Sequence, residues 1–364
     1  MSLKTLGISA FRNLANAEID LEGKDVFLVG ENGQGKTNFL EALYFCAYAS
    51  SFRGVGDSEL VRTGESGCAV AAHFNTSLYE RVLVTFEKGK KTIALDGKPI
   101  DDRKELLSVI PCIIFCHEDM EFVAGTPERR RWFFDQSQSL YDPVYLDDLR
   151  KYRKVLKTRN TVLKEHIGTI RTPIPMLDAL DPQLAMYGLK LMEKREKAAQ
   201  DFSETFGPLY KAVSGIDRIG VRYAPSWKDA TLDQIIALLQ IHRERDMISS
   251  LTLSGPHRDR YIFTREAHEF SGKASTGQRR LLALLLRVAQ ARRFSKMTGK
   301  KPILLLDDVL LELDGEKRRQ FLRIMPEYDQ AFYTFLPEEP FAGYRKPDTL
   351  VYDVFDGCIS QRYA

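Results

Sequence analysis

Apolar and polar positions alternate along the first 30 residues of the chain. The segments LKTLGISAF at 3–11 and AEIDLEGKDVFLVG at 17–30 follow the two-residue period of an extended chain and predict two strands. The second segment leads directly into a glycine-rich loop, after which residues 35–49 take the spacing of a helix. We therefore expect a strand, a strand, a loop and a helix in that order.

A second run of alternation covers residues 68–96. The segments CAVAAHFN, YERVLVTFEKG and KTIALDG are short, adjacent and separated by polar turns, a pattern that is typical of a strand meander. We expect this meander to be an antiparallel addition to the sheet that the first strands form.

Helical spacing dominates from residue 127 to about residue 250. Three prolines interrupt the region, and a proline ends or kinks a helix because it has no backbone N–H to donate. We expect an α-rich insertion with breaks at Pro173, Pro175 and Pro182.

The rest of the chain returns to a mixture of strands and helices. Its predicted elements are a strand pair around 251–270, a helix at about 276–297, a buried strand at 302–308, a helix near 315–324 and closing strands. The whole order predicts an α/β fold with a mixed β-sheet and an α-rich second lobe. We expect a discontinuous first lobe from 1–118 and 296–364, and a second lobe from 119–295.

The composition excludes several classes of protein. The first residues contain Arg12 and acidic side chains where a signal peptide needs an apolar stretch, and the longest apolar run, LLALLL at 281–286, is too short to cross a bilayer. Five scattered cysteines, an odd number, favour reduced thiols over a disulfide framework. We therefore expect a cytoplasmic protein with no membrane partner.

The glycine-rich loop matches a phosphate-binding pattern. Gly30, Gly35, Lys36 and Thr37 fit G-x-x-x-x-G-K-[ST], the Walker A pattern, in the strand–loop–helix context that it requires. The loop would point backbone N–H groups at phosphate oxygens, Lys36 would bridge the outer phosphates and Thr37 would offer its hydroxyl to Mg²⁺. The alternative is a glycine turn with an exposed lysine. The predicted nucleotide-binding residues are Gly30, Asn32, Gly33, Gly35, Lys36, Thr37 and Asn38.

Two adjacent carboxylates follow the apolar segment PILLL at 302–306. A buried parallel strand would deliver Asp307 at its carboxyl end, where α/β folds place their sites, and Asp307 would hold Mg²⁺. Asp308 would point the other way on an extended backbone, towards a water that it could orient or deprotonate. The alternative is that the two aspartates only end a strand and begin a turn.

The segment KASTGQRRLLALLL, from residue 273, begins an apolar helical pattern. Ser275 is in the position of an N-cap residue. The same hydroxyl, followed by Gly277 and Gln278, would also suit a second phosphate sensor, because a helix N-terminus presents free N–H groups and a positive dipole end. The sequence leaves both readings open.

In combination, the segments GENGQGKTN, STGQRR and LLLDDVLLELD resemble the RecF family, whose members have ABC-type ATPase heads of the SMC group. Further segments agree along nearly the whole chain: FRNL at 11–14, SFRGVGDSEL from 51, EDMEFVAGTPERRRWFFD from 118, LRKYRKVLKTRNTVLK from 149 and SGPHRDR from 254. Three positions depart from the family pattern. His117 replaces a proline, Arg260 replaces an acid and Leu311 replaces a small polar residue.

The resemblance implies that ATP is bound between two chains. Lys36 and Asp307 of one protomer would face Ser275 and Gly277 of the other, so that ATP with Mg²⁺ holds a homodimer together and hydrolysis releases it. In this arrangement Lys36 and Asp308 are the catalytic residues, and the enzyme is a weak, DNA-stimulated ATPase that acts as a timing switch.

The resemblance also implies a biological role. The family binds double-stranded, gapped and single-stranded DNA, acts with RecO and RecR, and promotes the loading of RecA during single-strand gap repair. Replication-fork maintenance and SOS induction belong to the same role.

A local basic cluster is the candidate DNA-binding surface. The net charge is only +3, from 53 basic and 50 acidic residues, so a polyanion has to be held locally. No acid lies between residues 150 and 164, while Leu149, Tyr152, Leu156 and Leu163 keep an apolar stripe. The alternative is an ordinary solvated face. The DNA-binding candidates are Arg150, Lys151, Arg153, Lys154, Lys157 and Arg159, in a run of seven basic residues that ends with Lys164, and Arg129, Arg130 and Arg131 would extend it.

Several other residues have weaker functional signals. We expect Cys112 and Cys116 to be buried thiols and not metal ligands, because no second ligand pair follows at zinc spacing. His257 is expected to position a loop, and Arg53 either approaches phosphate or anchors its own loop. At the C-terminal end of their helix, Arg292, Arg293 and Lys296 are expected to interact with its dipole, and the alternative is that they contact DNA.

Two other functions remain open from the sequence. One is the ATP-binding cassette of a transporter, although compact cassettes keep the equivalents of Lys36 and Ser275 much closer together in the chain. The other is a nucleotide-gated DNA-binding scaffold that hardly hydrolyses ATP.

Overall fold

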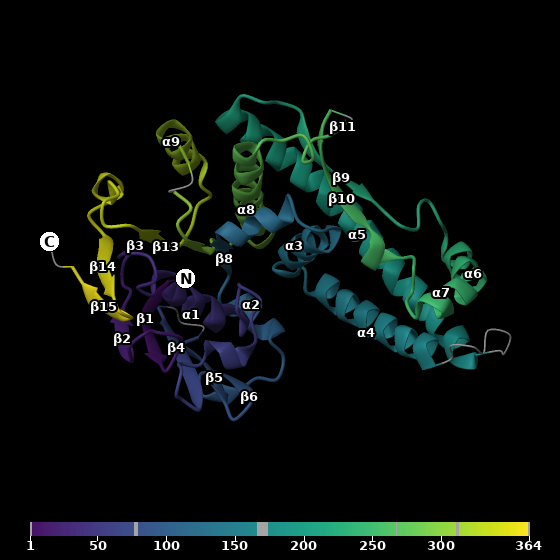
Figure 1. Cartoon of the computed structure of the whole chain (residues 1–364), viewed down its shortest axis with the longest axis horizontal. Helices are drawn as coiled ribbons and strands as arrows, with labels where there is room; N and C mark the ends of the chain where they lie inside the picture. The colour runs from purple at the N-terminus through teal and green to yellow at the C-terminus, as the bar shows by residue number, and fades with distance from the viewer. Residues whose placement is uncertain (1, 76–78, 166–173, 267, 311–312, 363–364) are drawn as a thin grey trace. The chain divides into compact units, whose positions relative to one another are not determined.

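The computed structural model describes residues 2–75, 79–165, 174–266, 268–310 and 313–362 (Figure 1). The chain divides into two compact units, Met1–Asp119 with Ala291–Ala364, and Met120–Gln290. We describe each unit by itself. The expected division into functional lobes, 1–118 with 296–364 and 119–295, stays a prediction.

A mostly parallel sheet is the centre of the first unit. It has six strands in the order β15-β14-β3-β13-β12-β8. The strands are β8 (Cys112–Phe115), β12 (Ile303–Leu306), β13 (Gln330–Phe335), β3 (Asp25–Val29), β14 (Thr349–Phe355) and β15 (Cys358–Gln361). All neighbours are parallel except β14 and β15. The buried strand expected at 302–308 is β12, which lies between two parallel neighbours.

The second sheet of this unit is antiparallel, in the order β2-β1-β4-β5-β6-β7. Its strands are β1 (Leu3–Ser9), β2 (Ala17–Asp20), β4 (Gly67–Phe74), β5 (Arg81–Glu87), β6 (Lys90–Leu95) and β7 (Lys98–Pro99). The predicted meander is therefore present. It adds antiparallel strands to the sheet of β1 and β2, as expected. The expectation that β3, the strand before the glycine-rich loop, belongs to this same sheet is wrong, because β13 and β14 pair with β3 on its two sides.

The single strand predicted for 17–30 is also wrong. The Glu22 N–H donates to the Asp20 carboxylate at 2.9 Å, and the Gly23 N–H donates to the Leu21 carbonyl at 2.7 Å. This turn separates β2 from β3, and the chain passes from the antiparallel sheet to the parallel one. The alternating pattern continued through the turn and concealed it.

Helix α1 (Lys36–Tyr48) packs in the core of the first unit, together with α2 (Lys104–Val109). The core contains Phe39 and Phe45 of α1 with Val26 and Leu28 of β3, and it includes apolar residues of β1, β4 and β5. Both sheets thus contribute to one core, which fixes the position of α1. The remaining elements of this unit are η1 (Asp57–Leu60), η2 (His117–Phe122), α9 (Gly315–Ile324) and η4 (Phe341–Tyr344).

The second unit consists mainly of helices. They are α3 (Pro127–Ser139), α4 (Pro143–Glu165), α5 (Pro175–Ser214), α6 (Leu232–Ile241) and α7 (Arg243–Ser249), and α8 (Thr276–Thr298) connects this unit to the first. A three-stranded sheet, β11-β10-β9, accompanies them, with strands β9 (Ile219–Ala224), β10 (Arg260–Arg265) and β11 (His268–Glu269). Helix α5 packs against both α4 and β9 (Figure 1).

Two expectations for this region are wrong. Pro182 does not break the helix, because it lies inside α5, which is 40 residues long. Leu177, Leu180 and Leu184 are buried along one side of this helix. The packing of that side outweighs the one backbone hydrogen bond that a proline removes. Strand β9 was missed inside the helical region, although its alternating burial is that of a strand. Pro173 lies outside the described residues.

No helix among the described residues is both long enough and apolar enough to span a membrane.

Candidate functional site

The glycine-rich loop lies between β3 and α1. Strand β3 ends at Val29 and α1 begins at Lys36, so residues 30–35 form the loop. The Lys36 side chain is 4% exposed, and its Nζ donates to the carbonyl oxygens of Gly30 at 2.6 Å and Glu31 at 3.1 Å. The alternative of an exposed lysine on a simple turn is therefore wrong.

Two glycines of this loop are required by its geometry. A Cβ atom on Gly30 would lie 2.3 Å from the carbonyl oxygen of Val354 in the neighbouring strand. Gly35 has a φ of +120°, a backbone conformation that side-chain-bearing residues rarely adopt. The loop thus keeps its shape only with glycine at both positions.

Two residues that the sequence analysis did not select brace the loop from outside. Asn38 Nδ2 donates to Asn13 Oδ1 at 2.7 Å, and Asn13 Nδ2 donates to the Gly33 carbonyl at 3.4 Å. Gln34 accepts from the backbone nitrogen of Asp356 at 2.7 Å. Asn13 belongs to the segment FRNL, so its membership of a family-like motif was the available signal. The predicted residues Asn32 and Gly33 are exposed at the tip of the loop.

Thr37 and Asp307 meet at the start of α1. Thr37 Oγ1 donates to Asp307 Oδ1 at 2.8 Å, which joins the P-loop (residues 30–37) to the end of β12. Burial, and after it the negative charge of Asp308, raise the pKa of Asp307 to about 6. The two residues expected to share a metal ion are therefore in contact, and one of them is a carboxylate that a nearby cation would stabilise.

The expected geometry of Asp308 is wrong. Asp308 has a φ of +52° and is not extended, so its side chain does not point away from that of Asp307. Its Oδ1 lies 2.8 Å from Thr334 Oγ1, which is also 3.3 Å from Asp307 Oδ1. Both carboxylates converge on one hydroxyl, because the turn after β12 is left-handed at this residue.

Thr334 and Glu339 were missed by the sequence analysis. Thr334 is the penultimate residue of β13, the strand next to β12, so it lies beside the aspartates only in the folded sheet. The Leu336 N–H donates to Glu339 Oε1 at 2.7 Å, and burial is the main cause that raises the pKa of Glu339. The charge of Asp308 raises that pKa and the charge of Lys36 lowers it, so Glu339 lies within the electrostatic reach of both predicted catalytic residues.

Arg53 anchors its own loop. Its guanidinium lies 3.8 Å from the carboxylate of Glu41, a fully buried residue of α1 that also accepts from Arg12 at 2.9 Å. The charge of Arg53 also lowers the pKa of Asp307, although less than burial raises it. The anchoring alternative is supported by a direct contact.

The predicted signature residues lie in the second unit. The Ser275 N–H donates to Gln278 Oε1 at 2.8 Å, and the Gln278 N–H donates to Ser275 Oγ at 3.3 Å. This reciprocal pair is a capping box, so Ser275 is the N-cap of α8. Ser275 and Gly277 are exposed. Their proposed second role towards a phosphate stays a prediction.

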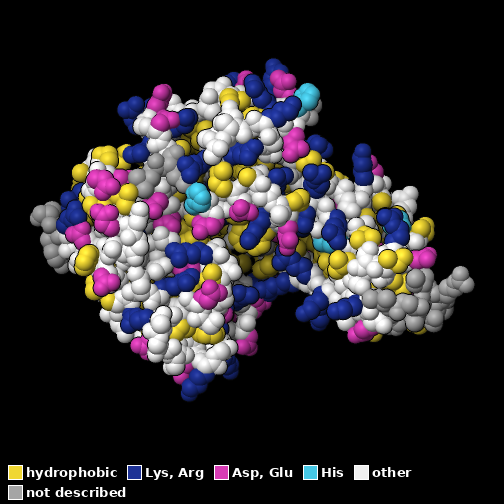
Figure 2. All heavy atoms as spheres, viewed as in Figure 1, with side chains coloured by type: hydrophobic (Ala, Val, Ile, Leu, Met, Phe, Trp, Pro, Cys, Tyr) yellow, Lys and Arg dark blue, Asp and Glu magenta, His cyan; other side chains and the backbone are white. Residues whose placement is uncertain are grey.

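Helix α4 contains the predicted basic surface. Arg150, Lys151, Arg153, Lys154 and Lys157 are exposed, and dark-blue side chains gather over α4 in the space-filling view (Figure 2). The apolar stripe faces inward, since Leu149, Tyr152 and Leu163 are buried. We define the five exposed residues as the basic face of α4.

Arg159 does not belong to this face. Its side chain is 0% exposed, and it donates to Asp181 at 2.8 Å, Asp246 at 2.7 Å and Thr252 at 2.8 Å. A guanidinium enclosed by two carboxylates holds α4, α5 and α7 together. The expectation that Arg159 binds DNA is therefore wrong, because charge alone did not tell which face of the helix it occupies.

Two of the three arginines proposed to extend the basic face, Arg130 and Arg131, have structural contacts. Arg130 donates to the carbonyl oxygens of Val123 and Tyr261, and Arg131 donates to that of Asp259 at 2.7 Å. Arg129 is exposed. These contacts show that two of the three consecutive arginines fix the position of α3.

Arg292 contacts another helix. It donates to the Ile324 carbonyl at the C-terminal end of α9, at 2.7 Å, and not to the end of its own helix as expected. The cation still meets an unpaired helical carbonyl, but tertiary packing decides which helix supplies it.

Cys112 and Cys116 are buried, and His257 positions a loop, as expected. All five cysteines are free, and Cys112 and Cys116 are buried. No cluster of three metal-ligating side chains occurs among the described residues. His257 contacts the Tyr152 hydroxyl through Nδ1 at 2.7 Å and the Thr252 carbonyl through Nε2 at 2.8 Å, which positions the loop before it.

Two of the three departures from the family pattern lie at element boundaries. His117 is the first residue of η2, and Arg260 is the exposed first residue of β10. Leu311 lies outside the described residues.

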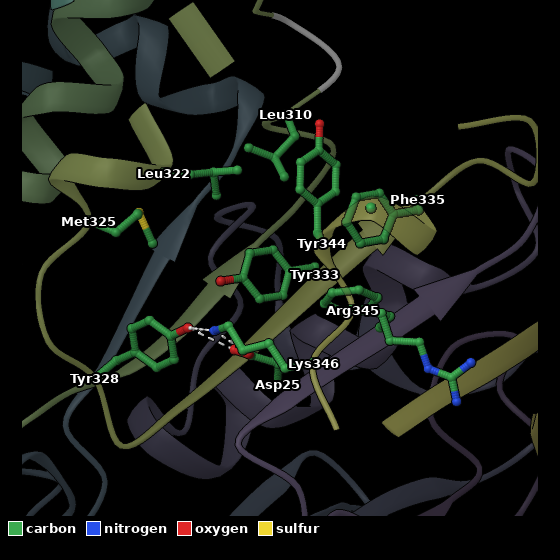
Figure 3. A pocket seen from close by; sticks show the side chains of 12 residues that line it. Asp25, Leu310, Leu322, Met325, Tyr328, Tyr333, Phe335, Tyr344, Arg345 and Lys346 are labelled. Atoms are coloured by element: carbon green, nitrogen blue, oxygen red, sulfur yellow. Dashed lines mark hydrogen bonds and ion pairs between the residues drawn. The ribbon is translucent and has the colours of Figure 1, made fainter. Parts of the chain in front are cut away.

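A pocket of about 360 Å³ lies on the face of the parallel sheet opposite α1 (Figure 3). Phe27, Tyr333 and Phe335 form its aromatic wall. Figure 3 shows Tyr328 and Lys346 pointing towards Asp25, whose carboxylate accepts from them at 2.8 and 2.7 Å. The pocket contains none of the predicted site residues, and its buried carboxylate is already neutralised by its own ion pair.

Comparison with known proteins decides the family. The family model described as "RecF/RecN/SMC N terminal domain" matches residues 2–347. The DNA replication and repair protein RecF of Treponema pallidum (strain Nichols) is 44% identical over 353 residues, which cover 96% of this chain and 99% of that protein. The chain belongs to the RecF family. Its relatives carry the name of DNA replication and repair proteins.

Other RecF proteins agree over the full length. RecF of Lachnoclostridium phytofermentans (strain ATCC 700394 / DSM 18823 / ISDg) is 32% identical over 364 residues, covering 99% of this chain and 100% of that protein. A solved structure of the recombination mediator protein RecF with ATP, from the RecFOR pathway, has a TM-score of 0.90 at 27% identity and covers 99% of this chain and 97% of that one. The predicted fold class, an α/β ABC/SMC-type ATPase head with a mixed sheet, is confirmed.

Proposed function

We propose that this chain is an ATP-dependent, DNA-binding recombination mediator of the cytoplasm that closes into a homodimer when ATP is bound. Its membership of the RecF family supports the proposal, as does its similarity to a RecF structure with ATP from the RecFOR pathway. With RecO and RecR it promotes RecA loading at single-strand gaps, and it takes part in replication-fork maintenance and SOS induction.

ATP occupies the P-loop in this proposal. The backbone N–H groups of a glycine loop and the positive end of the following helix dipole attract phosphate oxygens. Lys36 is already held above the loop by the Gly30 and Glu31 carbonyls, from where its ammonium reaches the outer phosphates. The contacts come from Gly30, Asn32, Gly33, Gly35, Lys36, Thr37 and Asn38.

The contact of Thr37 Oγ1 with Asp307 Oδ1, at 2.8 Å, is the single observation that carries the proposal. Hydroxyl and carboxylate oxygens are the ligands that Mg²⁺ prefers. The pKa of Asp307 is raised, and a bound cation would stabilise the charged form of this carboxylate. Thr37 and Asp307 would hold the ion, which would neutralise charge on the phosphates. We therefore infer Mg²⁺ as the metal cofactor.

Asp308 and Lys36 are the proposed catalytic residues. The Asp308 carboxylate is held by Thr334 beside Asp307, from where it orients or deprotonates the attacking water. Lys36 stabilises the charge that develops on the phosphates. Hydrolysis is slow, is stimulated by DNA and times the release of the dimer.

A second copy completes each site. Ser275, Gly277 and Gln278 lie at the exposed N-terminus of α8, where unpaired N–H groups and the helix dipole favour an anion. One P-loop and one such terminus per chain give two shared sites in a two-fold dimer. ATP thus joins the protomers, and its loss separates them.

The basic face of α4 is the proposed DNA-binding surface. Five exposed cations on one helix form a strip that neutralises phosphates without reading bases. This mode of binding suits double-stranded, gapped and single-stranded DNA alike. Arg150, Lys151, Arg153, Lys154 and Lys157 form the strip, and Arg159 is excluded because it is buried.

ATP hydrolysis measured with and without DNA tests the whole proposal. We expect a low rate that gapped DNA raises, and DNA complexes that form with ATP but not with ADP in a gel-shift assay. A chain that binds DNA with ATP but does not hydrolyse it would be the nucleotide-gated scaffold. Hydrolysis without any DNA binding would overturn the assignment as a recombination mediator.

A further inference from the structure

A second pocket, of about 370 Å³, lies in the second unit between α3, α4 and the 3₁₀ turn η3 (Pro256–Arg258). It is lined by Arg131 and Trp132 of α3, Tyr152 and Arg153 of α4, and His257 and Arg258 of η3. Its volume is in the range of ligand pockets, roughly 300–1,000 Å³. We name it the Trp132 pocket.

Trp132 presents an aromatic surface in this pocket. The residue is 39% exposed, whereas its neighbours Phe133 and Phe134 are buried. Its indole stacks on Phe122, with ring centroids 5.6 Å apart and an angle of 25° between the planes. Phe122 thus supports the indole from behind, and the exposed part of the ring lies in a pocket wall.

Guanidinium groups give the pocket a positive potential. Four arginines and two acids line it. Of the acids, Glu128 is exposed, and Asp135 is bound by Arg195 at 3.0 Å and lies 3.4 Å from Arg153. Burial, and to a lesser extent the charges of Arg258, Arg131 and Arg195, lower the pKa of His257 to about 4. The histidine is therefore neutral at physiological pH. Arg153 and Arg258 are exposed and Arg131 is partly exposed, so these three cations can meet an anion.

The walls of the pocket are held rigidly. Arg195 is 3% exposed and donates to Asp135, to Asp259 at 3.1 Å and to the Pro256 carbonyl at 2.7 Å. Tyr152 and His257 share a hydrogen bond of 2.7 Å. A preorganised pocket loses little conformational entropy when it binds a ligand.

We propose that the Trp132 pocket takes one unstacked nucleotide from a single-stranded stretch of DNA. The base stacks on the exposed part of Trp132, and Arg131 and Arg258 meet the adjoining phosphates. Arg153 lines the pocket and also belongs to the basic face of α4, so the same strand continues from the pocket onto that face. Stacking on an aromatic side chain is tolerant of sequence, because every base has a π-face.

This proposal rests on the proposed DNA-binding function and deepens it. A face of cations alone binds duplex and single strands through their phosphates. The pocket adds a contact that only an unpaired base makes. It would give the protein a preference for the single-stranded part of a gapped substrate.

Intrinsic fluorescence of the full-length protein tests the proposal. The chain contains two tryptophans, and Trp227 is 1% exposed with its indole N–H bonded to Ser254. Trp132 is therefore the reporter. We expect a short oligothymidylate to quench the fluorescence, and a blunt duplex to leave it nearly unchanged while still binding.

Variants separate base stacking from charge. We expect Trp132→Ala to weaken oligothymidylate binding by about tenfold, Trp132→Phe to retain most of the affinity, and both to bind duplex normally. An oligomer of abasic sites should bind the wild type and Trp132→Ala equally. Ile241→Ala, at a residue of α6 that is 76% exposed, is the control and should change neither affinity.

Several outcomes would overturn the inference. One is oligothymidylate binding that leaves Trp132 fluorescence unchanged. The others are quenching by polyglutamate, or by free thymidine monophosphate, that equals the quenching by oligothymidylate. Each of these leaves the proposed DNA-binding function intact. A wild-type protein that binds neither duplex nor single strands, with ATP present, would instead contradict the proposed function.

Discussion

The hydroxyl of Thr334 lies 2.8 Å from the Asp308 carboxylate and accepts from the Asp308 backbone N–H at 2.7 Å. One side chain therefore holds both the main chain and the carboxylate of the residue proposed to activate water. Strand β12 ends at Leu306, and Asp308 has a left-handed backbone with a φ of +52°. The Thr334 hydroxyl therefore takes the place of a strand partner for the backbone N–H of Asp308.

Thr334→Val should slow ATP hydrolysis while preserving ATP binding. Without the hydroxyl the Asp308 carboxylate loses its orientation, and we expect a fall in kcat of at least about tenfold, or ~1.4 kcal/mol. Phosphate release under saturating ATP measures the rate, and titration with a fluorescent ATP analogue measures the affinity. Thr334→Ser is the matched control and should keep most of the rate. Unchanged hydrolysis in Thr334→Val would show that Asp308 needs no such support.

Lys36→Arg should bind ATP but turn it over poorly. A guanidinium has the charge of the ammonium but not its compact geometry, so it does not fit beside the Gly30 and Glu31 carbonyls in the same way. We expect long-lived complexes with gapped DNA, measured as slow dissociation in the presence of ATP. Rapid dissociation in this variant would contradict the role of hydrolysis as the release step.

Ser275→Arg should abolish the ATP-dependent dimer and leave nucleotide binding by the monomer unchanged, as measured by light scattering and by titration. Ser275→Asp separates the two roles of this residue, because aspartate is a good N-cap but repels phosphate. We expect Ser275→Asp to keep the thermal stability of the protein and still lose the dimer. A normal dimer in Ser275→Asp would mean that Ser275 only caps α8.

Arg159→Leu should destabilise the protein by about 3–5 kcal/mol, because it leaves Asp181 and Asp246 buried near a missing cation. Denaturant unfolding measures this loss. Lys157→Leu, two positions earlier on the exposed side of α4, is the control. Lys157→Leu should change the free energy of unfolding little. It should lower the slope of log affinity for DNA against log salt concentration by about 1, which corresponds to the loss of one phosphate contact. If Arg159→Leu instead kept the stability and lowered the salt dependence of DNA binding, Arg159 would be a DNA-binding residue.

His257 should make the stability of the protein sensitive to acid. Its pKa is lowered from 6.5 to about 4, mainly by burial, so the unfolded chain binds a proton more readily than the folded one. The contribution is fully present above pH 6.5 and is lost as the pH falls towards 4, by at most about 3 kcal/mol. Unfolding free energies of the wild type and His257→Asn over this interval measure it. If the two proteins lost stability equally as the pH falls, His257 would not be the source of the acid sensitivity.

The sequence could predict the features that depend on local patterns. The P-loop is a short motif whose glycines and lysine act within one turn of the chain, and the helices at 36–48 and 276–298 follow from apolar spacing. The position of Asp307 followed from a short apolar run that ends in a carboxylate. The sequence thus predicted that Thr37 and Asp307 serve one Mg²⁺ site, whereas their direct hydrogen bond of 2.8 Å is a feature of the folded structure.

Sequence patterns did not reveal the features that depend on which strands become neighbours. Thr334 reaches the aspartates only because β13 pairs with β12, and no local signal marks this threonine. The division into two sheets depends on both edges of β3 being occupied. The left-handed turn at Asp308 likewise cannot be read from two adjacent aspartates.

The order of residue types along the chain sets the chemical groups that this protein has, namely a phosphate loop, a pair of carboxylates, a capped helix terminus and a run of cations. Folding then selects which of those groups are available. It buried Arg159 between two carboxylates and left Lys154 and Lys157 of the same helix exposed. The physical reason is that a residue's type fixes its charge and hydrogen-bonding capacity, whereas its partners are set by packing between segments far apart in the chain.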